Sequence, residues 1–499
     1  MSARSVWRMG PACSWPAGLV LLLAAESALA GPCARPTDSG GDQGYAYGDV
    51  APQTYGTSTV LVWYVTEGIH AVNHMSSRPD AVPDDVVEVA RVTSDALERY
   101  LELGFLAPIS DTLNPECGEN GGDERLDVYL VAMQGADGMT AIEPGRCATQ
   151  GNATRCASHI LAKADFAGSY ATPAEGIRTV LPHELFHAVQ NAYDAELDRF
   201  WAEGTAEWAA NWLDPSLRDF ERNLPAFFTQ TSRALDAPAN GVTAAFLYGS
   251  AIWPQFLSER HGEEIVRAIL EREAAVGGAS LASTDSVLAE EQSSLAEEFA
   301  LFSTWNAATG SRAGRGGYEN AANYPLVPLK PLGSSPIRGV TSGLASFYYH
   351  AKLGTPARVS LETNSKRNTA TLVPLLDGVA RLDRATSLPA ELTAEGIVVV
   401  SGITSSKTDA PFTLSLTPLA DGGSGGDSET DAGGAAAAGA AEAAGAASSG
   451  AGAGGTSQPE PSLASSGCTL SSGSSTPGMK ALAYLLLLLI PIRRRIRGH

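Results

Sequence analysis

Basic residues are scarce in this chain. Only 34 of its 499 residues are lysine or arginine, against 55 aspartates and glutamates. The formal net charge of −21 excludes nucleic acid and anionic membranes as general partners, because both carry the same charge sign. Charged residues make up 18% and hydrophobic residues 44% of the chain, so a wholly disordered polyelectrolyte is also excluded. The length predicts two or three domains.

Long hydrophobic runs are missing too, and the two short ones lie near the ends of the chain. Residues 1–30 combine two arginines, an apolar run at 17–25 and a small-x-small sequence at 28–30. This order is typical of a secretory signal peptide, and the run is too short for a membrane-spanning anchor. We therefore expect export.

The C-terminal end has a second pattern of the kind found in targeting signals. Residues 468–499 contain Cys468, an apolar run at 481–492 and a terminal arginine cluster. This arrangement resembles the MYXO-CTERM sorting tail of myxobacterial surface proteins. The resemblance implies processing at Cys468 by a sorting protease, contact with a membrane through the tail before or after processing, and a cell-surface, outer-membrane or secreted location. A plain C-terminal tail anchor is the alternative.

Six cysteines are few for the length, and one lies in the signal peptide and one in the tail. The remaining four, in an exported chain, predict two disulfides, with three possible pairings. A cysteine-based zinc site is disfavoured because no CxxC pair occurs. The favoured pairs are Cys147–Cys156, which closes a short turn, and by elimination Cys33–Cys117.

The hydrophobic pattern divides the exported part of the chain into three regions. Strand patterns come first and helical patterns later in residues 31–330, which favours an α+β domain. Residues 335–420 contain short strands separated by turn residues, which favours a small β-sandwich. Residues 421–467 are rich in Gly, Ala and Ser and are expected to form a disordered stalk. Within the first region we expect strands at 57–66, 126–133 and 158–166, a helix from Pro83 to Gly104, and helices over 175–308.

A metal-binding pattern lies in the helical part. His183, Glu184 and His187 form an HExxH sequence. On a helix, positions i and i+4 share one face, so both imidazoles can reach one metal ion, with Glu184 beside the bound water as general base. Two core histidines beside a helix acid are the alternative. Pro182 precedes the motif, so its helix either begins at Pro182 or is kinked there.

Zinc catalysis needs a third protein ligand and an open coordination position. No third histidine follows at the metzincin spacing, but the sequence WAEGTAEW offers Glu203 and Glu207. HExxH followed by EGxAEW resembles the gluzincin metallopeptidases. That resemblance implies Zn²⁺, Glu203 as third ligand, and Glu207 as an acid that supports a ligand histidine from outside the coordination shell. A solvated helix face is the alternative for Glu207.

A closer resemblance spans about residues 60–270. The sequences VPDDVVEVA, ERYLELGFLAP, LDVYLVAM, HELFHAVQNAYD and WAEGTAEW occur in this order. They resemble a family of predicted secreted myxobacterial metallopeptidases.

Peptide hydrolysis also needs a donor for the tetrahedral oxyanion. The segment FLYGSAIWPQFL is similar to the region where aminopeptidase-like gluzincins carry a tyrosine in this role, which implies Tyr248. Tyr193 is a second candidate, and His159 is the other histidine of interest, on a strand that could bind substrate backbone.

The sequence leads to two hypotheses about the function of this protein. The preferred hypothesis is an exported zinc metallopeptidase that acts on a protein or peptide, with Glu184 as general base and then proton donor. An endopeptidase is the preferred form and an exopeptidase the open alternative, although no GxMEN-type amine-binding sequence is visible. The alternative is a non-catalytic surface protein that uses the same scaffold for adhesion or binding. Glu184 counts against it, because a purely structural metal site does not need that residue.

Overall fold

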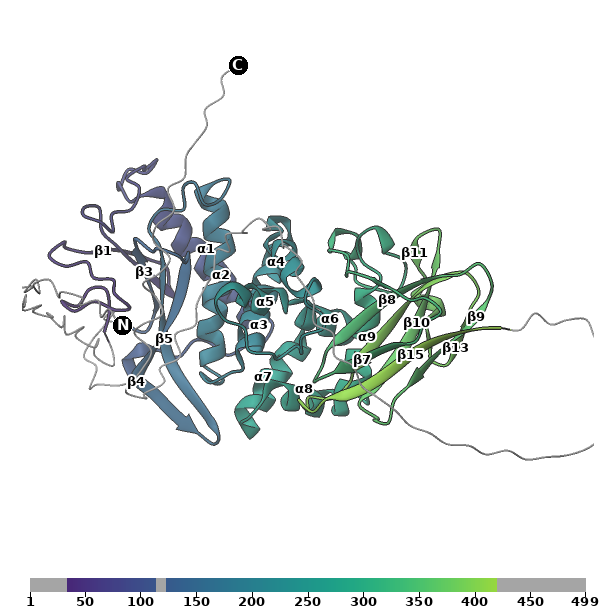
Figure 1. Ribbon diagram of the computed structural model, residues 1–499. Coiled ribbons are helices and arrows are strands. Elements are labelled where there is room, and N and C mark those ends of the chain that lie inside the picture. Colours follow the sequence, from purple (N-terminus) through teal and green to yellow (C-terminus); the bar gives the residue numbers. More distant parts are fainter. Residues whose placement is uncertain (1–33, 114–122, 420–499) are drawn as a thin grey trace, which may run out of the picture.

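The computed structural model describes residues 34–113 and 123–419. These residues form a mixed α and β structure with three sheets, in agreement with the predicted α+β class. Helices occupy the middle of the molecule, between the first sheet and the later strands (Figure 1). The predicted signal peptide, stalk and sorting tail, with Cys468 and the Cys33–Cys117 pair, lie outside the described residues. Within the described ranges, no helix is long and apolar enough to cross a membrane.

The first sheet has five strands in the order β1-β2-β3-β5-β4. The three inner strands are parallel, while β1 and β4 run antiparallel at the two edges. The expected strands at 57–66, 126–133 and 158–166 correspond to β2, β3 and β5, but β5 starts earlier because it pairs with β4 as a long hairpin. The bounds are β1 Gln53–Gly56, β2 Val60–Tyr64, β3 Leu126–Val131, β4 Gly138–Gln150 and β5 Ala153–Lys163.

Two helices cover one face of this sheet. Helix α1 (Asp84–Glu102) buries an apolar stripe, and Gly104 follows it at φ +84°, as the sequence predicts. Helix α2 (Pro173–Asn191) begins where the Thr172 side chain accepts the N–H of Glu175. The interpretation that the helix starts at Pro182 is therefore wrong. Pro182 lies inside α2, and its carbonyl accepts a hydrogen bond from the Tyr100 hydroxyl.

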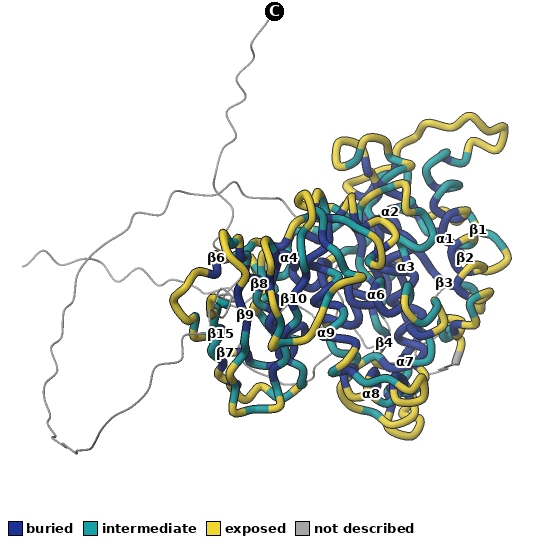
Figure 2. Tube along the Cα trace, turned by 90° about the vertical axis from the view of Figure 1, so that its right-hand side faces the viewer, coloured by how far each residue is buried: buried dark blue, intermediate teal, exposed yellow. Residues whose placement is uncertain are grey.

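Seven further helices follow α2, over the range expected from the sequence. An aromatic core that includes Trp253, Phe256, Phe299 and Phe302 holds several of them together. Helices α2, α3 and α6 carry many of the buried residues, which are drawn dark blue in Figure 2. The helices are α3 Arg199–Leu213, α4 Asp219–Phe228, α5 Ala245–Gly249, α6 Ile252–His261, α7 Glu264–Val276, α8 Ser280–Glu290 and α9 Leu295–Asn306.

The remaining strands form a six-stranded and a four-stranded sheet. Apolar side chains of both sheets fill the space between them, such as Tyr349 and Val398 from one and Val359 and Leu414 from the other. This is a β-sandwich. The other face of the six-stranded sheet packs on α9, where the Tyr348 hydroxyl donates to the Ser303 carbonyl. The strands are β6 Lys330–Pro331, β7 Ile337–Thr341, β8 Ser346–Lys352, β9 Ala357–Glu362, β10 Asn368–Leu376, β11 Val379–Ala380, β12 Thr386–Ser387, β13 Ala390–Leu392, β14 Glu395–Gly402 and β15 Ala410–Pro418.

Candidate metal centre

Helices α2 and α3 bring three potential metal ligands together. His183 and His187 lie one turn apart on α2, and Glu203 comes from α3. Their exposed fractions are 3%, 0% and 0%. The two histidine Nε2 atoms are 3.1 Å apart. Glu203 Oε2 lies 3.5 Å from the Nε2 of His183 and 3.6 Å from the Nε2 of His187.

This triangle has the size that a tetrahedral zinc site requires. With zinc–ligand bonds of about 2.0–2.1 Å, tetrahedral geometry separates two ligand atoms by about 3.3 Å. Both carboxylate oxygens of Glu203 are buried without a hydrogen-bond partner among the described residues. A buried carboxylate without hydrogen bonds is costly, and either a protonated His183 or a cation at the centre of the triangle would compensate it. The donor set therefore fits zinc with one coordination position left open.

A glutamine fixes the orientation of His187. Gln190 Nε2 donates to the Ala202 carbonyl at 2.8 Å and to Thr205 Oγ1 at 2.7 Å, so Gln190 Oε1 must face His187 Nδ1, which is 2.8 Å away. His187 then carries its proton on Nδ1, and the lone pair of Nε2 points to the ligand triangle. Gln190 was not among the site residues predicted from the sequence, although it follows His187 by three positions on the same helix face.

Glu207 contacts the other histidine. One of its oxygens lies 3.5 Å from His183 Nδ1, and the other accepts a hydrogen bond from Asn223 Nδ2 at 3.1 Å. Glu207 is 4% exposed, so it does not lie on a solvated helix face. It stands behind His183, on the side of the ring away from the triangle, whereas Glu203 faces both Nε2 atoms.

The charges of the site depend strongly on one another. Burial acts to lower the pKa of His183, but contacts with Glu203 and Glu207 outweigh it and raise this pKa to about 10. Burial acts to raise the pKa of Glu203, and the two histidines outweigh it and lower this pKa to about 2. Among the protein groups alone, the site is therefore a buried ion pair. Burial, with repulsion from Glu207, raises the pKa of Asp219 on α4 to about 7.

Glu184 lies against the edge strand β4. Its Oε2 accepts a hydrogen bond from Thr140 Oγ1 at 2.9 Å. Its Oε1 is buried and has no hydrogen-bond partner in the part of the chain that the structure describes. Glu184 thus directly follows His183 in sequence, with Oε2 held by Thr140 and Oε1 buried against Gly138.

The two tyrosine candidates lie in different surroundings. The Tyr248 ring packs 5.9 Å, centroid to centroid, from the His183 ring. The Tyr193 hydroxyl instead accepts the backbone N–H of Leu106 at 2.9 Å. This hydrogen bond holds the segment that follows α1. Tyr248 is therefore the better candidate for a donor beside the metal ligands.

His159 is part of a buried ion cluster on the other face of the sheet. Its ring nitrogens lie 2.9 Å from Asp42 Oδ2 and 3.3 Å from Glu143 Oε1. Glu143 also pairs with Arg35 and Arg146. His159 is 1% exposed. Its strand β5 is hydrogen-bonded to β3 on one side and to β4 on the other, so the expectation that this strand binds a substrate backbone is wrong.

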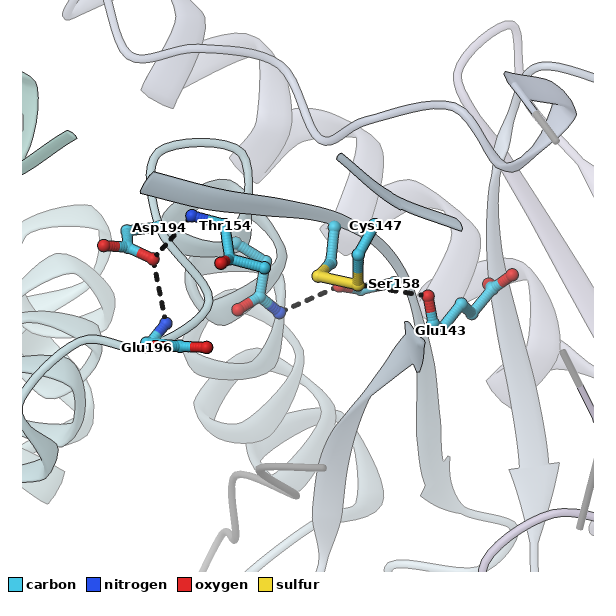
Figure 3. Close-up of a disulfide and its surroundings, with 8 residues drawn as sticks. Glu143, Cys147, Thr154, Ser158, Asp194 and Glu196 are labelled. Carbon is cyan, nitrogen blue, oxygen red and sulfur yellow. Dashed lines mark hydrogen bonds between the residues drawn. A yellow bond between two sulfur atoms is a disulfide. The ribbon is translucent and has the colours of Figure 1, made fainter. Parts of the chain in front are cut away.

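A disulfide links Cys147 on β4 to Cys156 on β5, which confirms this predicted pair. Figure 3 shows the bond beside the end of α2, where Asn191 Nδ2 donates to Ser158 Oγ at 2.8 Å. Nearby, Asp194 Oδ1 accepts the backbone N–H of Thr154. The long β4–β5 hairpin is thus fastened both within itself and to α2 and the residues that follow it.

Comparisons with known proteins add little. No protein-family model matches the chain, and no curated protein sequence matches it. Two solved structures of PliG, a periplasmic lysozyme inhibitor of g-type lysozyme, show weak similarity. The Aeromonas hydrophila protein has 12% identity and a TM-score of 0.15 over 18% of this chain and 94% of its own. The Salmonella Typhimurium protein has 10% identity and a TM-score of 0.13 over 17% and 90%. Similarity at this level carries no argument about fold or function.

Proposed function

We propose that this protein is a zinc metallopeptidase of the gluzincin type, favoured as an endopeptidase. One observation carries the proposal. Three buried ligand atoms from His183, His187 and Glu203 form a triangle with sides of 3.1, 3.5 and 3.6 Å. Both Glu203 oxygens lack a hydrogen-bond partner among the described residues. Glu184 beside this triangle supports a hydrolytic rather than a structural role.

Each residue then has a distinct part. Zinc, when bound, lowers the pKa of a water molecule and polarises a carbonyl group. Glu184 accepts the proton of the attacking water and later delivers it to the leaving amine. Tyr248, which packs on the ring of His183, is the candidate donor to the oxyanion. Gln190 and Glu207 hold the two ligand imidazoles in orientation.

The test combines metal analysis with a base variant. Elemental mass spectrometry of the purified protein should give about one zinc per chain. Cleavage of a peptide library should follow zinc loading. Glu184→Gln should keep its zinc and lose about 100- to 10,000-fold of its activity. Glu175→Gln, the same change about two and a half turns earlier on α2, is the matched control and should remain active.

The outcomes separate the peptidase from its alternative. Zinc binding with equal activity in wild type and Glu184→Gln would contradict the role of Glu184. Zinc binding without any peptide cleavage would favour a non-catalytic adhesion or binding protein on the same scaffold. A protein that binds no zinc would contradict the assignment of the three ligands.

We propose further that the protein is exported and reaches the cell surface, the outer membrane or the medium. The support is the signal-like start and the sorting-like tail of the sequence. Intact-mass measurement of the native protein should give an N-terminus near residue 31 and a C-terminus near residue 467. A native chain that still ends at His499 would contradict processing at Cys468.

A further inference from the structure

The first residue of β4 lets the strand approach the metal helix closely. A Cβ atom built on Gly138 would lie 2.6 Å from Val180 Cγ1, 2.7 Å from Glu184 Cγ and 2.8 Å from Glu184 Oε1. Real Cβ atoms essentially never make contacts shorter than 3.0 Å. Only glycine therefore fits here without displacing the Glu184 side chain.

Two residues further along β4, a threonine contacts Glu184 directly. Thr140 is fully buried. Its hydroxyl oxygen lies 2.6 Å from the Glu184 carbonyl oxygen and 2.9 Å from Glu184 Oε2. The carboxylate is the stronger acceptor of the single hydroxyl proton, because hydrogen bonds to ionised groups are about twice as strong as neutral ones. The Thr140 hydroxyl therefore donates to the carboxylate of Glu184, and its contact with the Glu184 carbonyl oxygen is not a second hydrogen bond.

The strand itself is anchored on its opposite face. Glu143 points away from α2 into the buried ion cluster, where it pairs with Arg35, with Arg146 at 2.8 Å and with His159 at 3.3 Å. Beyond it, the Cys147–Cys156 disulfide joins β4 to β5. A strand held at these points gives the Thr140 hydroxyl a fixed position.

We propose that Gly138 and Thr140 form the positioning element for the general base. Thr140 holds Oε2, and Gly138 leaves the space in which Oε1 stays free of hydrogen-bond partners among the described residues. Oε1 is then the oxygen that receives the proton of the attacking water. The inference rests on the proposed peptidase function. Thr140 acts through Glu184 and has no contact with substrate in this role.

The experiment compares Thr140→Val, Thr140→Ser and wild type. Valine has nearly the shape of threonine without the hydroxyl, so Thr140→Val should keep its zinc and its KM while kcat falls about 10- to 100-fold. Thr140→Ser retains the hydroxyl and should stay within about threefold of wild type. Thr93→Val is the matched control, because Thr93 is also fully buried and its hydroxyl donates only to the Val89 carbonyl.

A second measurement does not depend on turnover. A peptide hydroxamate binds the metal and gives its proton to the carboxylate base, so its affinity also reports on the position of Glu184. Isothermal titration calorimetry of zinc-loaded protein should show at least tenfold weaker binding to Thr140→Val than to Thr140→Ser. Gly138→Ala should weaken binding as well, because the added Cβ displaces the carboxylate.

The outcomes are distinct for the two proposals. Wild-type kcat and hydroxamate affinity in Thr140→Val would overturn the positioning role. If Thr140→Val loses its zinc or its fold, Thr140→Ser decides: wild-type turnover supports the role and a large loss overturns it. If wild type binds zinc but cleaves no peptide, the peptidase proposal fails and the hydroxamate affinities alone decide the positioning. If wild type binds no zinc, both the peptidase proposal and the positioning proposal are contradicted.

Discussion

Replacing Gln190 should weaken zinc binding without altering the chemistry of the loaded protein. Gln190→Leu removes the contact with His187 Nδ1 and two donor bonds, to the Ala202 carbonyl and to Thr205 Oγ1. The His187 ring then loses the group that sets its tautomer and rotation. Partners of this kind are worth about 10- to 100-fold in metal affinity, which corresponds to about 1.4–2.7 kcal/mol of binding free energy.

Stability should fall in the same variant. Three buried hydrogen bonds contribute about 1 kcal/mol each, so we expect a loss of about 2–4 kcal/mol in the free energy of unfolding. This loss must be separated from the effect on the ligand. Asn191→Leu serves as the control, because Asn191 is equally buried and loses its bond to Ser158 Oγ without touching a metal ligand.

The assay is a zinc competition with a chromophoric chelator, run on all three proteins at a temperature where each is folded. Gln190→Leu should show a 10- to 100-fold higher Kd for zinc, and Asn191→Leu should stay within about twofold of wild type. At saturating zinc, Gln190→Leu should recover most of its kcat. An unchanged Kd in folded Gln190→Leu, or an equal loss in Asn191→Leu, would refute the reasoning.

Three further predictions concern protons and the disulfide. Because the pKa of His183 is raised to about 10, zinc binding at pH 7 should release about one proton from this ring, which calorimetry in buffers of different ionisation enthalpy would detect. Replacing Cys147 and Cys156 by serine should lower the free energy of unfolding by about 2–3 kcal/mol, as expected for a loop of sequence separation 9, measured by urea denaturation. Burial raises the pKa of Glu273 to about 8 despite its hydrogen bond with Ser280. The folded state therefore binds the extra proton, so this stabilisation is complete below about pH 4.5 and is lost as the pH rises to about 8. Urea titrations of Glu273→Gln should lack this pH dependence, worth up to roughly 5 kcal/mol in wild type.

The sequence could predict the part of the site that depends on local geometry. Helix periodicity alone puts His183 and His187 on one face, and the structure has their Nε2 atoms 3.1 Å apart. Periodicity could not choose between Glu203 and Glu207, which lie one turn apart on α3 and therefore share a face. The choice depends on how α3 crosses α2, a tertiary feature, and the prediction of Glu203 came from family resemblance.

The residues that hold Glu184 could not be predicted in this way. Strand β4 gave no clear strand pattern, because Pro144 and several glycines and polar residues interrupt it and its pairing with β5 shifts register between Ile142 and Cys147. The contact of Thr140 with Glu184 spans 44 positions in the sequence. It exists only because the β4–β5 hairpin returns the edge strand to α2.

The buried ion cluster behind β4 supports the view that this strand is built for position. Arg35, Asp111, Asp127, Glu143 and His159 are all less than 9% exposed. A set of buried charges costs desolvation that apolar side chains of the same size would avoid, so it adds little net stability. The cluster instead fixes the register of β4, because its ion pairs form in only one register of the strand. A shift of β4 by one residue would turn Glu143 toward α2 and take the Thr140 hydroxyl away from Glu184. The cluster thus penalises a displacement that would take the Thr140 hydroxyl away from Glu184.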